Sequence, residues 1–489
     1  MQFMHRLRRL LRLLFISALL TLSSITLSLT AFATTPVVTV TSPANGSQDK
    51  SPVNFTASAS SPDCAAGIAA MRIYTAPGDG PYTTDSSHLD VNLNVAAGSY
   101  NTVVQAWDNC GGVGKTPVNI TVSGNALPAP RFVYSSDFND NKIYEYLVDA
   151  STGALTPTSQ GSLVTASHPA QIASDQGGFR LYVANTGSEE LSAYFINRDD
   201  GGLQAVPGVP GSLTGYPTAV VVHPSGDYVY VTTTLNAAPN YIYAFKVESN
   251  GSLSPVPGSP FASQYDPTAA VIDPAGSFLY VSTINASYTE AYAVDKSNGS
   301  LAPVSGQPFP LVDQQSECSP GAEGLAFAQN GHHLVVPELC DGVITVYNVN
   351  STNGKLTNAS GSPVIDPQPA SYQPVDLEAI AVDPLNRWWY LYETFPSELP
   401  GGDIATLTPK DVAERTGQQC GDIIRADPSG KFVYAIGNTT GDGECGASPG
   451  AILGFSVNQS NGTLTPLPGF PLASPNADYY GEDGLVVTR

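Results

Sequence analysis

The feature that most constrains the fold is a short segment that recurs along the chain. It reads "HPSGDYVYVTT" at 223–233, "DPAGSFLYVST" at 273–283 and "DPSGKFVYAIG" at 427–437. Each copy predicts a tight turn followed by a strand, because Pro presets one turn angle, Gly tolerates positive φ, and aromatic and β-branched residues favour extended backbone. Related segments begin at 175, 328 and 383, and the strand alone begins at 131.

The residues that follow each copy are repeated as well. A second apolar strand comes next, as at 289–294, and several copies then reach an Asn-Gly turn, as at 250–255 and 461–466. Asn-Gly between apolar runs is a strong hairpin signal, so each unit predicts about four strands. The units recur every 44 to 55 residues. This period is typical of a β-propeller, and seven units predict seven blades over residues 131–489.

The two ends of this region complement each other. The first unit lacks the strand that precedes the recurring segment elsewhere, and the closing "YYGEDGLVVTR" at 479–489 matches that missing strand. We therefore expect the C-terminal strand to complete the first blade and close the ring, which removes an open sheet edge. The tyrosines in the middle of the recurring strand are expected to pack between blades, namely Tyr182, Tyr230, Tyr280, Tyr390 and Tyr434. His332 and His333 align with the start of this strand and are expected at the surface.

The chain begins with a segment typical of export. A basic stretch with four arginines precedes a long apolar run that ends in Ala31-Phe32-Ala33. This pattern predicts a secretory signal peptide over 1–33, with a signal anchor as the alternative. The expected location is secreted or periplasmic, with no integral membrane domain once the signal peptide is removed.

Residues 34–124 predict a separate small domain. Short alternating strands are separated there by Gly, Pro, Asn and Ser, as in a β-sandwich. The opening "VTVTSPANGS" and the closing "VVQAWDNCGGVGKTPVNITV" resemble bacterial immunoglobulin-like domains of exported proteins. The stretch "NALPAP" at 125–130 predicts a short, stiff linker to the propeller. The fold class is thus all-β, with an immunoglobulin-like sandwich followed by a seven-bladed propeller.

The six cysteines predict structural disulfides. None belongs to a C-x-x-C motif, and the histidines are scattered, so no zinc or other metal site is expected from them. In the immunoglobulin-like arrangement two cysteines lie in loops at the same end of the sandwich, and in the propeller each remaining pair lies on one face of its blade. The expected pairs are Cys64–Cys110, Cys318–Cys340 and Cys420–Cys445.

The charge balance restricts the partners. The chain has 20 Lys and Arg against 42 Asp and Glu, a net charge of −22, and four of the arginines lie in the signal peptide. A field of this sign repels nucleic acid and anionic membranes. The sequence also contains no G-x-S-x-G motif and no phosphate loop. A monomer without nucleic-acid partners is expected.

The strands "LYVAN" and "YVYVTT" and the pattern D-P-x-G-x-F-L-Y-V resemble YVTN-type propellers and, within them, the lactonase family of 6-phosphogluconolactonase-like and muconate-lactonizing-like enzymes. The resemblance covers nearly all of 131–489. It implies a site with Arg and His in a segment like G-P-R-H-x-x-F-x-P-N-G and Glu in a strand ending N-E-L. Here Glu338 matches the Glu, whereas Glu323 and Gly324 occupy the Arg and His positions. The resemblance therefore implies Glu338 as the catalytic residue, without the cation and the imidazole.

Carboxylates recur at one repeat position. Five residues before the recurring segment, or at the equivalent place, the chain carries Ala170, Thr218, Thr268, Glu323, Glu378, Asp422 and Asp483. Glu393 and Glu338 add to the same face from loops after the recurring strand. One interpretation is a solvated acidic rim. The other is an acidic arc that attracts a cationic ligand or holds Ca²⁺. No other cofactor is expected.

Two functions follow from these observations. The first is an exported, non-enzymatic binding module whose acidic loop face takes a cationic ligand, a carbohydrate or a protein partner. The second is a divergent lactonase or related hydrolase that uses Glu338. A lactone hydrolysis assay separates the two.

Overall fold

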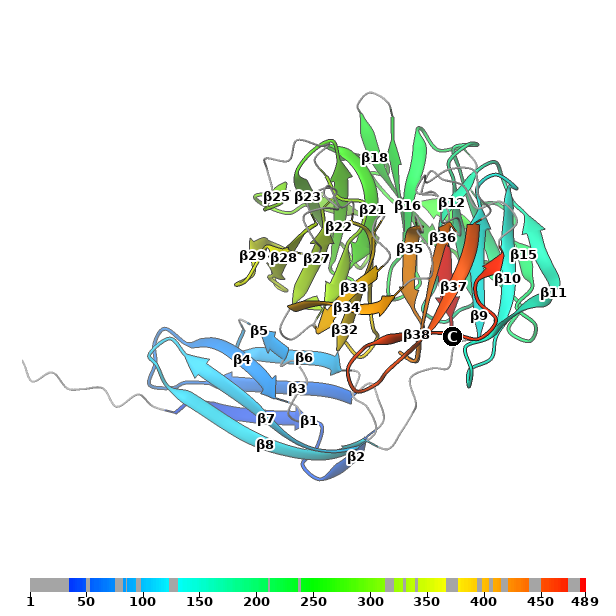
Figure 1. Ribbon diagram of the computed structural model, residues 1–489. Coiled ribbons are helices and arrows are strands. Elements are labelled where there is room, and N and C mark those ends of the chain that lie inside the picture. The colour runs from blue at the N-terminus through cyan, green and yellow to red at the C-terminus, as the bar shows by residue number, and fades with distance from the viewer. Residues whose placement is uncertain are drawn as a thin grey trace, which may run out of the picture.

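The computed structural model of the chain describes two all-β units (Figure 1). The described residues are 35–49, 53–74, 82–84, 86–93, 98–122, 131–209, 212–235, 239–312, 321–328, 331–338, 342–365, 377–393, 398–403, 408–414, 421–438, 450–473 and 484–489. The expected signal peptide and linker lie outside these ranges. Within them, no helix has the length and apolar character needed to cross a membrane.

The N-terminal unit consists of two sheets around one core. Its strands are β1 (Val37–Ser42), β2 (Ser47–Asp49), β3 (Val53–Ser60), β4 (Ile68–Tyr74), β5 (Tyr82–Thr84), β6 (His88–Leu93), β7 (Gly98–Asp108) and β8 (Val113–Val122). The sheets have the orders β1-β3-β6 and β2-β8-β7-β4-β5. Phe55, Met71 and Val104 from both sheets are fully buried in the shared core. Inward and outward residues alternate along β8, as the pleat of a strand requires.

The second unit contains seven sheets within the described ranges, which we number as blades 1 to 7. Blade 1 has β9 (Phe132–Asp137), β10 (Lys142–Val148), β11 (Leu155–Val164) and the C-terminal β40 (Leu485–Thr488). Blade 2 has β12 (Pro169–Ser174), β13 (Arg180–Asn185), β14 (Glu190–Ile196) and β15 (Leu203–Ala205). Blade 3 has β16 (Tyr216–Val222), β17 (Tyr228–Thr234), β18 (Asn240–Val247), β19 (Leu253–Pro255) and β20 (Phe261–Ser263).

The remaining blades repeat this arrangement. Blade 4 has β21 (Asp266–Ile272), β22 (Phe278–Ile284), β23 (Tyr288–Val294), β24 (Leu301–Pro303) and β25 (Phe309–Pro310). Blade 5 has β26 (Ala326–Ala328), β27 (His333–Pro337), β28 (Val343–Val349), β29 (Leu356–Asn358) and β30 (Val364–Ile365). Blade 6 has β31 (Leu377–Val382), β32 (Trp388–Glu393), β33 (Glu398–Asp403) and β34 (Thr408–Glu414). Blade 7 has β35 (Gly421–Ala426), β36 (Phe432–Asn438), β37 (Gly450–Val457), β38 (Leu464–Pro466) and β39 (Leu472–Ala473).

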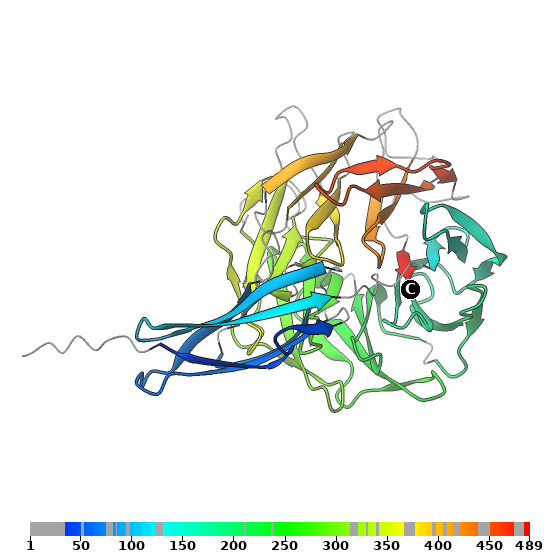
Figure 2. The same cartoon turned by 90° about the horizontal axis from the view of Figure 1, so that it is seen from below.

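One strand of each blade lies at the inside of the ring. We call these the inner strands: β40, β12, β16, β21, β26, β31 and β35. Inner strands of neighbouring blades contact one another, as β12 contacts β16 and β31 contacts β35. The strand that pairs with the inner strand in each blade is called the second strand, and it contains the recurring tyrosine in every blade except blade 5, where Val335 takes its place. Figure 2 shows the blades arranged around a centre, with β40 toward the middle.

The turn between inner and second strands is built by its aspartate. Asp273 is almost fully buried, and its Oδ1 accepts hydrogen bonds from the backbone N–H groups of Ser277 (2.5 Å) and Phe278 (2.6 Å). Asp427 does the same for Lys431 (2.8 Å) and Phe432 (2.6 Å). The aspartate of the recurring segment therefore closes the turn by capping its backbone donors.

In four blades the hydroxyl of the recurring tyrosine is hydrogen-bonded to the next blade. Tyr280 is fully buried, and its hydroxyl donates a hydrogen bond of 2.9 Å to the carbonyl oxygen of Gly354 in the outer hairpin of the following blade. The same bond is made by the pairs Tyr134–Gly201 (2.7 Å), Tyr230–Gly299 (3.0 Å) and Tyr434–Gly153 (2.8 Å). The hydroxyls of Tyr182 and Tyr390 make no such bond within the described ranges, but their side chains pack against the following blade. The expectation that these tyrosines pack between blades is therefore confirmed, and the pair Tyr434–Gly153 connects blade 7 to blade 1.

The outer-hairpin glycine also receives an aromatic ring from the preceding blade. Gly354 has a φ of +73°, and a Cβ placed on it would lie 2.4 Å from Cδ1 of Phe278. Gly153 and Phe432 repeat the arrangement at 2.6 Å. Only glycine combines this backbone conformation with so close an approach, which explains the Asn-Gly turns of the sequence.

The C-terminal strand lies beside the first strand of the propeller. β40 pairs antiparallel with β9, with Leu485 opposite Ser135 and Val487 opposite Val133. The N–H of Arg131 donates to the carbonyl oxygen of Thr488 at 3.0 Å. Blade 1 thus takes its inner strand from the other end of the chain.

Substitution of the outer-hairpin glycine tests the contact between blades. Gly354→Ala is expected to lower the free energy of unfolding by about 3 kcal/mol, because the new methyl group overlaps the Phe278 ring at positive φ. The control is Gly361→Ala, which has a φ of +96° but no neighbouring heavy atom within 4 Å, and it should cost about 1 kcal/mol. Urea unfolding gives both values, and equal losses would contradict the packing argument.

Removal of residues 484–489 tests the role of β40. The deletion is expected to lower the free energy of unfolding by about 3 kcal/mol or more, since the fully buried Leu485 is lost with it and the edge of β9 is exposed. Urea unfolding followed by circular dichroism measures the change, with deletion of Arg489 alone as the control. A truncated protein with the parent's midpoint and slope would show that β40 is dispensable.

Candidate functional site

One end of the ring gathers the starts of the inner strands and the ends of the second strands, and we call it the loop mouth. The antiparallel register places Tyr216 opposite Thr234 and Leu377 opposite Glu393 at this end. Hydroxyl groups connect neighbouring blades here by donating hydrogen bonds to backbone carbonyl oxygens. The three bonds are Ser136 Oγ to Ala170 O (2.6 Å), Thr186 Oγ1 to Pro217 O (3.0 Å) and Thr268 Oγ1 to Ala322 O (2.6 Å). The mouth is therefore bordered by ordered polar groups.

The repeat position with the carboxylates is the bulge of the inner strand. The register of the inner and second strands shifts around Thr218, Glu378 and Asp422, and blades 2 and 4 shift at the corresponding place. A β-bulge leaves its extra residue out of the ladder and redirects the side chain. In blades 3 and 4 that side chain meets the second strand, with Thr218 Oγ1 at 2.9 Å from Thr232 Oγ1 and Thr268 Oγ1 at 3.0 Å from Ser282 Oγ.

The predicted acidic arc is only partly visible. Glu323 is exposed, between the buried Ala322 and Leu325. Glu378 and Asp422 lie on the neighbouring inner strands β31 and β35, and Glu393 ends β32, but the side chains of these three fall outside the described part of the chain, as does the whole of Asp483. The bulge positions are thus brought to the same end of adjacent strands, and the arc as a ligand or Ca²⁺ site remains a prediction.

A ring of buried polar residues follows the recurring tyrosine by three positions. Its described members are Asp137, Asn185, Thr233, Thr283 and Glu338, each at most 3% exposed. Their partners are local: Thr283 Oγ1 donates to Tyr288 O at 2.8 Å, and Asn185 Nδ2 donates to Ser192 Oγ at 2.9 Å. Blades 1 to 5 therefore each have one buried polar side chain at this place, a carboxylate in blades 1 and 5, whereas blade 7 has Gly437 there.

Glu338, the candidate catalytic residue, belongs to the described part of the chain, and its side chain has defined partners. It directly follows β27, and its backbone N–H donates to Val343 O at 2.8 Å, which fixes the start of the loop. The hydroxyl of Thr345 on β28 donates a short hydrogen bond to Glu338 Oε1 and accepts one from the N–H of Val312 at 2.8 Å. The carboxylate is thereby held in one orientation near the loop mouth, where it can accept a proton from a water molecule.

The expected surface position of the two adjacent histidines is wrong. Both side chains are half-buried, and His333 Nδ1 lies 3.3 Å from the carbonyl oxygen of Tyr347. Burial, followed by the charges of His333 and of Arg72 on β4, lowers the pKa of His332 to about 4. Blade 5 therefore lies near the N-terminal unit at this point. The sequence could not show this neighbour because Arg72 belongs to the other unit.

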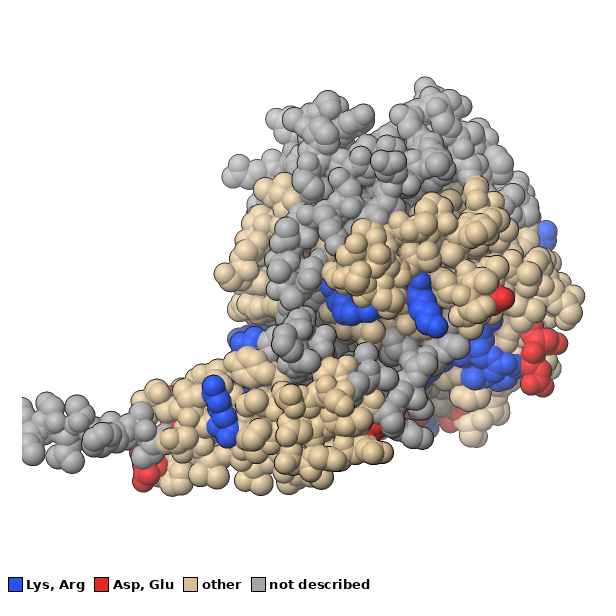
Figure 3. Space-filling view, turned by 60° about the horizontal axis from the view of Figure 1, so that its bottom comes forward, with Lys and Arg blue, Asp and Glu red and all other residues tan. Residues whose placement is uncertain are grey.

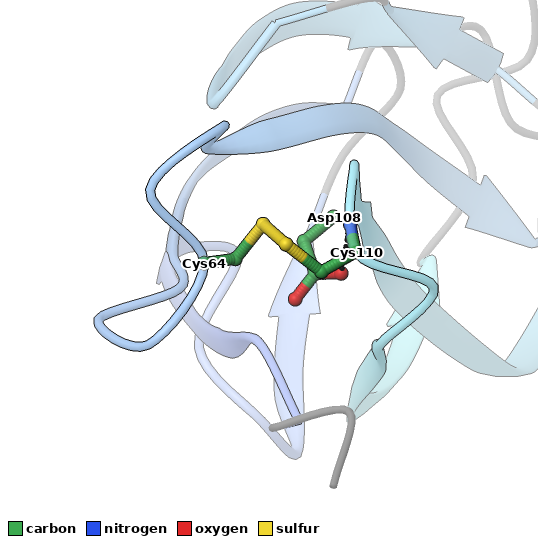
Figure 4. A group of neighbouring side chains, drawn as sticks. All are labelled: Cys64, Asp108 and Cys110. Carbon is green, nitrogen blue, oxygen red and sulfur yellow. Dashed lines mark hydrogen bonds between the residues drawn. A yellow bond between two sulfur atoms is a disulfide. The ribbon is translucent and has the colours of Figure 1, made fainter. Parts of the chain in front are cut away.

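Cys64 and Cys110 form the expected disulfide, with a Cα–Cα distance of 5.9 Å (Figure 4). Asp108 lies beside it and accepts hydrogen bonds from Ser61 Oγ (2.6 Å) and the N–H of Gly112 (2.7 Å). These bonds, the one from Ser61 first, hold the pKa of Asp108 below its usual value. Among the described residues this is the only cluster with metal-ligand spacing, but its sulfur atoms are bonded to each other and offer no thiolate.

The other four cysteines, Cys318, Cys340, Cys420 and Cys445, lie outside the described residues, so their pairing stays a prediction. On the face shown in Figure 3 the described Lys and Arg lie in separate groups, and the group at the right lies beside Asp and Glu residues.

Two carboxylates are buried away from the mouth. Glu290 accepts hydrogen bonds from the N–H groups of Gln264 (2.8 Å) and Tyr265 (3.0 Å), which explains its burial. Glu145 is also fully buried and occupies the place where blades 2 and 3 have Ala193 and Ala244. Its partner is the hydroxyl of Thr158 at 2.9 Å, and burial raises its pKa from 4.5 to about 7.

The raised pKa of Glu145 predicts a pH-dependent stability. Because the folded protein keeps this proton up to about pH 7 while the unfolded chain loses it near pH 4.5, stability falls as the pH rises between these values, by up to about 3 kcal/mol. Glu145→Gln should remove this loss. The unfolding free energy of the variant, compared with that of wild type, should therefore be higher at pH 8 than at pH 4. Urea unfolding across this range tests it, with the exposed Asp199→Asn as control. A constant difference in unfolding free energy between Glu145→Gln and wild type would contradict the assignment.

Comparisons with known proteins agree with the fold. The sequence model of a family described as "Lactonase, 7-bladed beta-propeller" matches residues 124–313. No curated protein sequence matches the chain.

Two solved structures are similar. The periplasmic gluconolactonase of Pseudomonas aeruginosa is 18% identical over 74% of this chain and 99% of that protein, with a TM-score of 0.59. A putative 6-phosphogluconolactonase from Bacteroides uniformis is 16% identical over 73% of this chain and 100% of that protein, with a TM-score of 0.56. At these identities the likeness concerns the fold.

Proposed function

We propose that this protein is an exported propeller of the lactonase type, which hydrolyses the lactone of a sugar acid. The observation that carries the proposal is the buried Glu338, oriented by Thr345 at the loop mouth and located where the lactonase-like motif has its Glu. The match to the lactonase propeller family over 124–313 supports the same function. It is favoured over a non-enzymatic binding module, whose acidic arc rests on side chains outside the described residues.

Glu338 would act as the general base. It takes a proton from a water molecule, whose oxygen attacks the carbonyl carbon of the lactone and forms a tetrahedral intermediate. The ring C–O bond then breaks, the departing ring oxygen takes up the proton, and the product is an open-chain hydroxy acid. The hydroxyl of Thr345 keeps the carboxylate oriented during both proton transfers.

The remainder of the motif differs from the family pattern. The place of the Arg is taken by the exposed Glu323, and Gly324 takes the place of the His. A charge that binds an anionic substrate group must therefore come from another part of the chain.

Export and the N-terminal unit fit this proposal. The basic and apolar start of the chain is typical of a signal peptide, and the Cys64–Cys110 disulfide is typical of an oxidising compartment. The two-sheet unit of residues 35–122 would be an immunoglobulin-like spacer that holds the propeller away from an attachment point.

Hydrolysis of glucono-δ-lactone, corrected for spontaneous opening, tests the function. Glu338→Gln is expected to lower kcat/KM by about 100-fold or more, since it removes the proton acceptor and keeps the shape of the side chain. Glu248→Gln, an exposed change at the outer edge of blade 3, should leave the rate unchanged. A wild-type protein without activity on gluconolactone and other sugar lactones, or a Glu338→Gln variant as active as the parent, would refute the proposal in favour of a binding module.

A further inference from the structure

An arginine lies on the inner strand of blade 7. Arg425 is half-buried on β35, between Ile424 and Ala426. β36 pairs with one edge of β35, and the inner strands β31 and β40 contact it from the neighbouring blades. Because these described strands cover the other sides of β35, we take the exposed part of the Arg425 side chain to face the central channel of the propeller.

The same position is apolar and small in the other blades. In the strand register, Arg425 lies opposite Tyr434 of the second strand. Its counterparts in the other blades are the inner-strand residues that lie opposite the recurring tyrosine, or opposite Val335 in blade 5. These counterparts are Val486, Ala173, Val221, Val271, Ala326 and Ala381. Alanine or valine therefore satisfies the fold at this place, and packing does not require an arginine.

No carboxylate neutralises Arg425 within the described part of the chain. The ion pairs found there are Lys142–Asp140, Arg180–Asp175, Lys246–Glu248 and Arg387–Asp383. Arg425 Nη1 instead donates to the carbonyl oxygen of Ile424 at 3.0 Å. The nearby Asp427 accepts hydrogen bonds from backbone N–H groups of its own turn, at 2.6 Å from that of Phe432.

The guanidinium remains charged in this position. Burial lowers its pKa to about 10, which still leaves it protonated at neutral pH. A partly desolvated cation that has no carboxylate partner among the described residues is unfavourable, and an oxyanion would offset this cost. The planar fork of arginine suits carboxylate and phosphate groups, because two parallel N–H donors meet two oxygens.

We infer that Arg425 is the binding residue of an anion site in the central channel, which takes the carboxylate or phosphate group of a small ligand. The alanines and valines of the same ring form the apolar wall around it. The net charge of −22 makes the rest of the protein repel anions, so an anion is retained only where a local cation faces it. The inference goes beyond lactone hydrolysis, because binding at Arg425 requires no turnover.

Calorimetric titration in chloride-free buffer tests the site, with sodium gluconate as the carboxylate probe and inorganic phosphate as the phosphate probe. Wild type is expected to bind at least one of them, and the stronger one identifies the source of the anion. Arg425→Val should weaken that binding at least tenfold and should fold normally, since Val221 and Val271 occupy the same place in blades 3 and 4. Lys296→Ala removes one exposed positive charge elsewhere and should bind within twofold of wild type.

A second measurement follows the melting temperature. The bound anion should raise the Tm of wild type and of Glu338→Gln but not of Arg425→Val, because only a ligand that binds the folded state stabilises it. Anion binding retained in Glu338→Gln separates this site from the hydrolysis proposal. The inference is overturned if neither probe binds wild type, or if Arg425→Val binds as tightly as wild type.

Discussion

The contact between the recurring tyrosine and the outer glycine of the next blade is the interaction on which the ring depends. The tyrosine hydroxyl finds its acceptor in the neighbouring blade, at 2.9 Å for Tyr280 and Gly354. The glycine admits an aromatic ring so closely that any Cβ would overlap it. Because the contact joins one blade to the next in blades 1, 3, 4 and 7, it sets the spacing of the blades there. The pair Tyr434–Gly153 makes the same contact between the last blade and the first.

The same register positions the candidate functional groups. Glu338 lies at the buried polar place three residues after the tyrosine position, and Arg425 lies directly opposite Tyr434 on the inner strand. The bulge of the inner strand places Glu378 and Asp422 at the loop mouth. Blades with a charged residue at these places keep the same pairing of inner and second strands as blades with threonine or valine there. The seven copies of one structural unit thus carry different chemistry.

Much of the fold could be predicted from the period of the sequence, and much of the site could not. The strands, the turns, the interblade tyrosines and the Cys64–Cys110 bridge follow from local patterns. Arg425 and the half-buried His332 were missed, because their environment is formed by other blades or by the N-terminal unit. The bulges were missed as well, since an extra residue in a strand has no distinct composition.

The sequence by itself determined the repeating unit, since turn chemistry and strand propensity act over neighbouring residues. It also placed the carboxylate of Glu338 in the motif that resembles the lactonase family. Only the tertiary structure decided which of these residues meet. Tyr280 and Gly354 are separated by 74 positions, yet they form a hydrogen bond. Whether a charged side chain such as Arg425 is solvated or faces a channel depends on the strands on either side of it, and these come from distant parts of the chain.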